Sequence, residues 1–214
     1  MNIESITVGA FQTNCFVVWS EPQHAVVIDP GSEAERIAEF LRGNGLTPAC
    51  YLLTHGHMDH VSGVADLHDT MPAPVGIASV DLEWAFSVDN RMPPFYEPPR
   101  RPSETEIRLT EGENPLEKLG YECSVIATPG HTPGSVCLLF PQDKALFSGD
   151  TLFAGSVGRT DMPGGDSRTL NESLKKLTAL PDDTVVYCGH GPSTTIGREK
   201  EVNYFVQRSG HLSG

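Results

Sequence analysis

The chain has 214 residues, enough for one domain with a substantial core and at most a small appendage. Its formal net charge of −13 at pH 7 argues against a nucleic-acid-binding surface, and no cluster of lysine and arginine offsets that charge. The sequence shows no apolar run of membrane-spanning length and no signal peptide, so we expect a cytoplasmic protein without a membrane or nucleic-acid partner.

Alternating short apolar runs and amphipathic segments predict β and α units in two similar halves. In the first half we expect strands at 14–19, 24–29, 50–53 and 72–77, a turn at 20–23, and helices from a Ser32–Glu35 capping box to Gly43, at 59–67 and at 80–88. In the second half we expect strands at 123–128, 136–140, 145–148 and 184–188, and helices at 168–180, capped by Asp166 or Ser167, and at 196–207.

Two further features bear on the organisation of the chain. The segment 92–102 contains five prolines and is expected to be a surface connector, with the alternative that Phe95 and Tyr96 contact a substrate. The cysteines are odd in number and well spread, which predicts buried reduced thiols rather than disulfides: Cys15, Cys50, Cys123, Cys137 and Cys188. We find no linker, so one domain over residues 1–214 is predicted.

One stretch carries an unusual density of metal-binding side chains. Residues 54–60 read Thr-His-Gly-His-Met-Asp-His and directly follow the apolar run 50–53. Histidine and aspartate are common metal ligands, and four of them so close together are hard to explain by packing. His131, Asp150 and His190 also follow predicted strands. Because strand ends at one edge of a sheet converge, these side chains together predict a metal site.

With this pattern the sequence resembles the metallo-β-lactamase superfamily. The resemblance is carried by His55-x-His57-x-Asp59-His60, then His131, Asp150 and His190, with Asp29-Pro30-Gly31 upstream. It implies an α+β fold, the αββα metallo-β-lactamase-type sandwich. It also implies that one metal is bound by His55, His57 and His131, the other by Asp59, His60 and His190, and that Asp150 bridges both. The implied cofactors are two divalent ions, zinc first, with iron or manganese as alternatives.

Within that superfamily the sequence resembles the glyoxalase II-like thioester hydrolases, on residues 148–153, 158–161 and 189–192. Residues 163–166 extend the resemblance to a short bacterial branch, so no separate C-terminal helical domain is expected. The implied activity is hydrolysis of thioesters such as hydroxyacyl-glutathione, by attack of a metal-bridging hydroxide on the carbonyl. Asp59 and Asp150 are the implied catalytic residues, and Asp59 would orient the hydroxide.

Three more residues are candidates for supporting a ligand or contacting substrate: Asp29, Arg159 and Tyr96. A structural turn is the alternative for Asp29, and a structural ion pair joining loops is the alternative for Arg159. Cys188, close to His190 in sequence, is interpreted as a buried strand residue rather than a nucleophile.

Other functions remain open at this point. The Gly-Arg-Thr-Asp motif at 158–161 also occurs in persulfide dioxygenases of this fold, which hold one iron through residues equivalent to His55, His131 and Asp150. A mononuclear-iron dioxygenase is therefore the alternative, although Gly-His-Gly-Pro at 189–192 favours the hydrolase. A non-catalytic metal-binding scaffold is disfavoured because no ligand is missing, and an exported β-lactamase because no signal peptide is found. The oligomeric state is left open.

Overall fold

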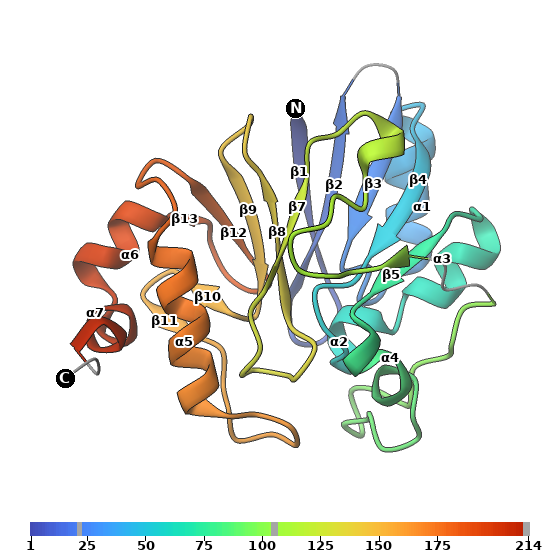
Figure 1. Cartoon of the computed structure of the whole chain (residues 1–214). Coiled ribbons are helices and arrows are strands. Elements are labelled where there is room, and N and C mark those ends of the chain that lie inside the picture. The colour runs from blue at the N-terminus through green and yellow to red at the C-terminus, as the bar shows by residue number, and fades with distance from the viewer. Residues whose placement is uncertain (21–22, 104–106, 212–214) are drawn as a thin grey trace. The chain divides into compact units, whose positions relative to one another are not determined.

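The computed structural model describes residues 1–20, 23–103 and 107–211 of the chain (Figure 1). It divides into two compact units, Met1–Arg108 and Leu109–Gly214. Each unit consists of one larger β-sheet with helices, as the two predicted β/α halves require.

Unit 1 is organised on a six-stranded sheet in the order β1-β2-β3-β4-β5-β6. Its strands are β1 (Asn2–Val8), β2 (Thr13–Ser20), β3 (His24–Ile28), β4 (Thr47–Leu52), β5 (Val75–Ile77) and β6 (Ile107–Arg108). The first three pair antiparallel and the remaining pairs are parallel. The predictions missed β1, because its residues are mostly exposed and only Ile6 and Val8 are buried.

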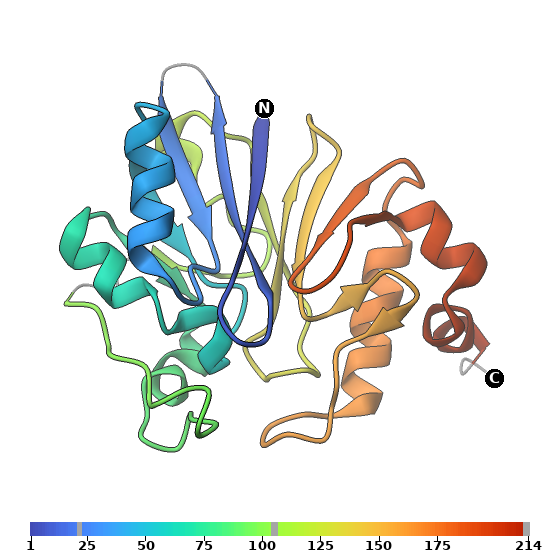
Figure 2. The same ribbon diagram turned by 180° about the vertical axis from the view of Figure 1, so that it is seen from behind.

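The helices of unit 1 are α1 (Ala34–Gly43), α2 (Met58–Val61), α3 (Val64–Thr70) and α4 (Ser79–Ala85). Figures 1 and 2 show α1 and α3 together on one side of the sheet, where Ile37, Leu41 and Leu67 join its core. Their apolar residues recur at helical spacing, so one face of each helix can be buried against the strands.

Two predictions about these helices are wrong. The capping box is wrong because α1 starts after Glu33, whose backbone is left-handed with φ 51°, and no side chain caps the helix. The single helix 59–67 is wrong because the chain bends between α2 and α3. At this bend a Cβ on Gly63 would lie only 2.6 Å from the carbonyl oxygen of Pro30, so the glycine allows the two backbones to approach closely. The predicted turn 20–23 lies partly outside the described residues.

Unit 2 contains a five-stranded sheet in the order β13-β12-β9-β8-β7 and a two-stranded sheet of β10 and β11. The strands are β7 (Ser124–Ala127), β8 (Val136–Phe140), β9 (Ala145–Gly149), β10 (Leu152–Phe153), β11 (Ser156–Val157), β12 (Val185–Cys188) and β13 (Thr194–Thr195). The four predicted strands of this half are confirmed, whereas the two-residue strands were too short to leave a pattern. β9 and β12 pair in parallel, so their carboxyl ends lie at the same edge of the sheet.

The helical part of unit 2 consists of η1 (Glu117–Leu119), α5 (Ser167–Thr178), α6 (Ile196–Val202) and α7 (Tyr204–His211). The predicted cap of α5 is confirmed, since Thr169 N donates to Asp166 Oδ1 at 2.6 Å. The single helix predicted at 196–207 is wrong. The helix breaks at Asn203, whose side-chain oxygen accepts from the backbone N–H groups of Phe205 and Val206 and so starts α7.

Two expectations about the whole chain can be compared with the described residues. All five cysteines are buried and free, as predicted. Among residues 1–20, 23–103 and 107–211, no helix has the length and apolar character needed to cross a membrane.

Candidate metal centre

The predicted ligand cluster lies where β4 ends and α2 begins. Leu53 N donates to Gly76 O at 2.8 Å, which extends the sheet by one more residue before the chain turns into the histidine segment. The side chains of His55, His57, Asp59 and His60 are all buried. Burying four such polar side chains is costly unless hydrogen bonds or a cation compensate them, so the segment is not an ordinary solvated loop.

Asp29 lies at the centre of a hydrogen-bond network that orients two of these histidines. Its Oδ2 atom accepts from Thr54 Oγ1 at 2.6 Å and from His60 Nδ1 at 2.9 Å, and its Oδ1 accepts from Thr54 N at 2.7 Å. Because the Thr54 hydroxyl donates to Asp29, its oxygen accepts from His55 Nδ1, 3.1 Å away. Both histidines therefore carry their proton on Nδ1, which leaves the lone pair on Nε2 for coordination.

The Thr54 hydroxyl gives a direct test of this network. We expect Thr54→Val, which keeps the shape but removes the hydroxyl, to lose about 1–3 kcal/mol of folding free energy because buried partners lose a hydrogen bond. Metal affinity should fall roughly 10- to 100-fold, while Thr54→Ser should retain it. Chemical denaturation of the metal-free protein and chelator competition measure the two effects. Wild-type affinity in the valine variant would show that His55 does not depend on this hydroxyl.

Asp59 is positioned by Thr13, which the sequence did not suggest, and by Gly31 of the Asp-Pro-Gly segment. Thr13 Oγ1 donates to Asp59 Oδ2 at 3.1 Å, although the two residues are 46 positions apart. Gly31 packs against the backbone of the ligand helix, so closely that a Cβ there would overlap the carbonyl oxygen of Asp59. The Asp-Pro-Gly segment therefore supports the ligand cluster in two ways. The carboxylate of Asp29 accepts hydrogen bonds from it, and the missing side chain of Gly31 leaves room for the ligand helix.

Unit 2 brings together the other three predicted ligands. His131 follows β7, Asp150 follows β9 and His190 follows β12. Asp150 Oδ2 lies 3.5 Å from His131 Nε2 and 3.5 Å from His190 Nε2. Gly189 N donates to Gly149 O at 2.8 Å, so the parallel pairing of β9 and β12 continues up to these ligands and brings them together.

His131 is oriented by the backbone of the Gly-Arg-Thr-Asp segment. Its Nδ1 donates to the carbonyl oxygen of Arg159 at 2.8 Å, which again assigns the lone pair to Nε2. The Arg159 guanidinium forms two hydrogen bonds with Asp161, two residues further on. These bonds lower the pKa of Asp161 to about 2. The ion pair is thus local to its own loop.

Two other residues considered from the sequence are deeply buried. Tyr96 is only 6% exposed, and its ring lies 5.1 Å from that of Phe11, whereas neighbouring Phe95 is 58% exposed. Burial and the negative charge of Asp59 raise the pKa of Tyr96. Burial also raises the pKa of Cys188 to about 12, so its thiol stays protonated at neutral pH and is a poor nucleophile.

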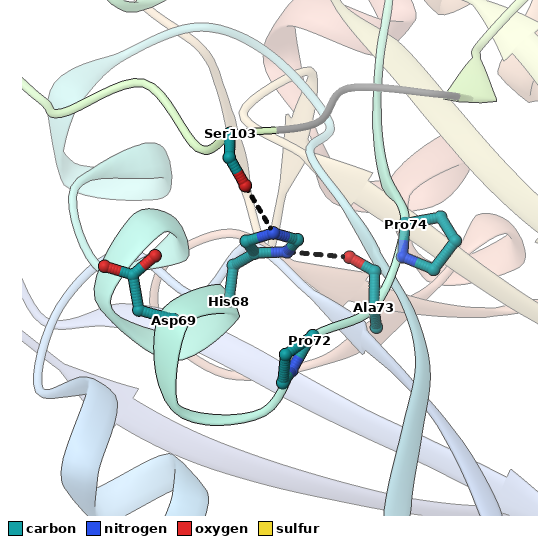
Figure 3. Close-up of a pocket in the computed structure, with 6 residues that line it drawn as sticks. All are labelled: His68, Asp69, Pro72, Ala73, Pro74 and Ser103. Carbon is teal, nitrogen blue, oxygen red and sulfur yellow. Dashed lines mark hydrogen bonds between the residues drawn. The ribbon is translucent and has the colours of Figure 1, made fainter.

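A separate pocket of about 550 Å³ lies beside the end of α3 (Figure 3). It is lined by His68, Asp69, Pro72, Ala73, Pro74 and Ser103, none of which is a predicted ligand. Figure 3 shows both ring nitrogens of His68 engaged, Nδ1 with the carbonyl oxygen of Ala73 at 2.9 Å and Nε2 with Ser103 Oγ at 3.0 Å. His68 thus joins three segments of unit 1 and has a structural role.

The geometry of the predicted ligands suits a divalent cation. The separations between Nε2 and carboxylate oxygen are 3.5 Å for His131 and His190 with Asp150, and 3.7 Å for His60 with Asp59. These distances are longer than an ordinary hydrogen bond. They are near the roughly 3.3 Å expected between two ligands of a tetrahedral ion with bonds of about 2.0–2.1 Å. Imidazole nitrogen and carboxylate oxygen together suit zinc, iron or manganese.

Comparison with known proteins identifies the family. The model of the metallo-β-lactamase superfamily matches residues 8–190, and the chain belongs to this superfamily. The hydroxyacylglutathione hydrolase GloC of Haemophilus influenzae is 38% identical, over 96% of this chain and 98% of its own length. The predicted resemblance to the glyoxalase II-like group is confirmed at the level of sequence similarity.

Solved structures confirm the predicted fold class. The crystal structure of the BLEG-1 B3 metallo-β-lactamase matches with a TM-score of 0.88 and 36% identity, covering 96% of this chain and 99% of that one. TTHA1623, crystallised in a di-iron-bound form, matches with a TM-score of 0.84 and 38% identity, covering 94% and 99%. The chain therefore has the metallo-β-lactamase fold.

Proposed function

We propose that this chain is a metal-dependent hydrolase of thioesters such as hydroxyacyl-glutathione. The observation that carries the proposal is the 38% identity with a hydroxyacylglutathione hydrolase over nearly the full length of both chains. The buried histidines and aspartates, with Nδ1 atoms engaged and Nε2 atoms near carboxylates, support it independently. Hydrolysis at such a site needs no side-chain nucleophile, which agrees with the raised pKa of Cys188.

For the cofactor we propose two divalent ions. One would be held by His55, His57 and His131 and the other by Asp59, His60 and His190, with Asp150 shared. The position of Asp150 Oδ2, equally far from two imidazole nitrogens, supports its role as a shared ligand. Zinc is the first choice for such donors, and the di-iron form of TTHA1623 is a reason to test iron beside it.

In this proposal each residue of the site has a distinct role in hydrolysis. Bound divalent ions would lower the pKa of water to about 7 and polarise the substrate carbonyl. Asp59, fixed by the Thr13 hydroxyl, would orient the resulting hydroxide toward the substrate carbonyl. Asp29 and Thr54 would keep His60 and His55 in the tautomer that presents Nε2. The leaving group is a thiolate, which departs without needing a strong general acid.

We further propose a small-molecule substrate and a cytoplasmic location. Five buried, free thiols suit a reducing compartment, which is also where glutathione thioesters would be met. Phe95 is exposed whereas Tyr96 is buried, so Phe95 is the better candidate of the two for a substrate contact.

Metal analysis combined with three assays tests the function. Freshly purified protein should contain close to two metal ions per chain and hydrolyse hydroxyacyl-glutathione, with release of free thiol. One iron per chain with oxygen uptake on glutathione persulfide would overturn the proposal in favour of the dioxygenase. Because BLEG-1 is a B3 metallo-β-lactamase, a β-lactam is the third substrate, and faster turnover of it than of the thioester would also overturn the proposal. Bound metal without any turnover would indicate a non-catalytic scaffold.

A further inference from the structure

Helix α6 carries a buried carboxylate that is not among the proposed metal ligands. Glu199 is only 1% exposed. Its Oε2 atom accepts from Gly155 N at 2.8 Å and from Asn203 Nδ2 at 2.7 Å, and its Oε1 accepts from Thr194 Oγ1 at 2.6 Å. All three donors are uncharged. Because a buried carboxylate is costly unless hydrogen bonds compensate it, the three donors are held in place around Glu199.

These bonds connect α6 to the turn of the β10–β11 hairpin, residues 152–157 (Figure 1). Gly155 lies in that turn with a left-handed backbone, φ 76°. Asn203 Nδ2, which donates to Glu199, also donates to the carbonyl oxygen of Ser156 at 3.0 Å. Each strand of the hairpin has only two residues, so its own pairing contributes little stability. The bonds from Glu199 and Asn203 therefore fix the turn of the hairpin.

The end of the hairpin leads directly into residues that position two predicted ligands. Gly158 follows β11, and a Cβ there would overlap the carbonyl oxygen of Asp150, so the two backbones are in close contact. The carbonyl oxygen of the next residue, Arg159, accepts from His131 Nδ1 at 2.8 Å. A displacement of the hairpin would therefore move the backbone of Asp150 and the acceptor that orients His131.

The start of the hairpin contacts the third predicted ligand of unit 2. The ring of Phe153 packs edge-on against that of His190, with the ring centroids 6.1 Å apart and the planes at 71°. The side chain of His190 is 26% exposed, and the ring of Phe153 restricts its rotation on one side. One small hairpin thus contacts the surroundings of all three ligands of this unit, while Glu199 holds its turn.

We propose that Glu199 is a positioning residue for the ligands of unit 2. By accepting from Gly155 N, it fixes the turn of the β10–β11 hairpin, and the hairpin in turn sets the environments of His131 and His190. Glu199 acts through the geometry of its hydrogen bonds and not by coordinating an ion. Its effect on metal binding rests on the proposed function, whereas its effect on the two imidazoles does not.

NMR of the metal-free, full-length protein tests the positioning. In the wild type we expect the Gly155 amide proton to be protected from solvent exchange and shifted downfield by the carboxylate. Glu199→Ala should expose this amide and move the imidazole resonances of His131 and His190, with His68 of unit 1 unmoved as the internal reference. Rapid exchange of the Gly155 amide in the wild type would overturn the proposal even if Glu199→Ala failed to fold.

Two further variants separate the contact with the hairpin from support of α6 alone. Thr194→Val removes the bond between Glu199 and β13 but keeps the bond to Gly155, so the resonances of His131 and His190 should stay in place. Glu199→Gln keeps an oxygen for Gly155 N and can donate to Thr194 Oγ1, so it should restore the wild-type resonances. If either variant moved the two resonances as far as Glu199→Ala does, helix support or charge would explain the effect and the proposal would fail.

Metal affinity tests the consequence for the proposed function. Chelator competition should show Glu199→Ala weakening metal binding roughly 10- to 100-fold, with Glu199→Gln and Thr194→Val within about threefold of the wild type. Wild-type affinity in Glu199→Ala would overturn the role of Glu199 toward the metal. If the wild type bound no metal, the proposed function would fail, and the metal-free spectra would still decide whether Glu199 positions the two histidines.

Discussion

Asp150→Ala is expected to abolish tight metal binding and, with it, all metal-dependent activity. Asp150 Oδ2 lies 3.5 Å from Nε2 of both His131 and His190, so its removal takes away the carboxylate that both imidazoles face. The remaining donors of unit 2 are neutral, and the loss of a carboxylate also removes a negative charge that balances a divalent ion. We expect metal affinity to fall by more than about 100-fold, above the range typical of residues that merely support a ligand.

Metal content after dialysis and thioester turnover measure this loss, and an exposed aspartate of the same unit provides the control. Asp143, in the turn between β8 and β9, is exposed and is not a proposed ligand, so Asp143→Ala should keep both metal content and activity. Full activity in Asp150→Ala would contradict the whole ligand assignment, for the hydrolase and for the dioxygenase alike.

The ligands themselves could be predicted because the chain supplies them in recognisable places. His55 to His60 lie together in the sequence, so their spacing alone indicates a metal site. Asp150 and His190 each directly follow a run of β-forming residues. Parallel pairing of β9 with β12 then places both at one edge of the sheet, which a reader of the sequence can expect from strand order.

The groups that orient the ligands could not be predicted from the sequence. Some are backbone atoms, which every residue has, and others lie far from the ligand along the chain. His131 is oriented by the carbonyl oxygen of Arg159, and every residue carries such an oxygen. Thr13 reaches Asp59 across 46 positions, and only the folded sheet brings them together. The break at Asn203 could not be predicted either, because the sequence alone does not show whether an asparagine caps a new helix or lies inside a continuous one.

Gly158→Ala is expected to damage the site from the backbone, without removing any ligand. A Cβ at this position would overlap the carbonyl oxygen of Asp150 and lie 3.2 Å from Cγ of His131. A carbonyl of the main chain cannot rotate away as a flexible side chain would, so the segment that carries Asp150 must shift. Overpacking of this kind costs about 1–3 kcal/mol of folding free energy. Because metal ligation tolerates little displacement, we expect the free energy of metal binding to fall by a larger fraction than the free energy of unfolding.

Gly43→Ala is the matched control, because Gly43 is the last residue of α1 and a Cβ there would meet nothing within 4 Å. Alanine at such a helical position should be neutral or stabilise by up to roughly 1 kcal/mol. Thermal unfolding of the metal-free proteins, with chelator titration of the loaded ones, compares the two substitutions directly. If Gly158→Ala bound metal as tightly as Gly43→Ala, the glycine of the Gly-Arg-Thr-Asp segment would be needed only for the local backbone turn and not for the metal site. A selective loss in Gly158→Ala would instead assign it to the close packing that holds Asp150 and His131 in place.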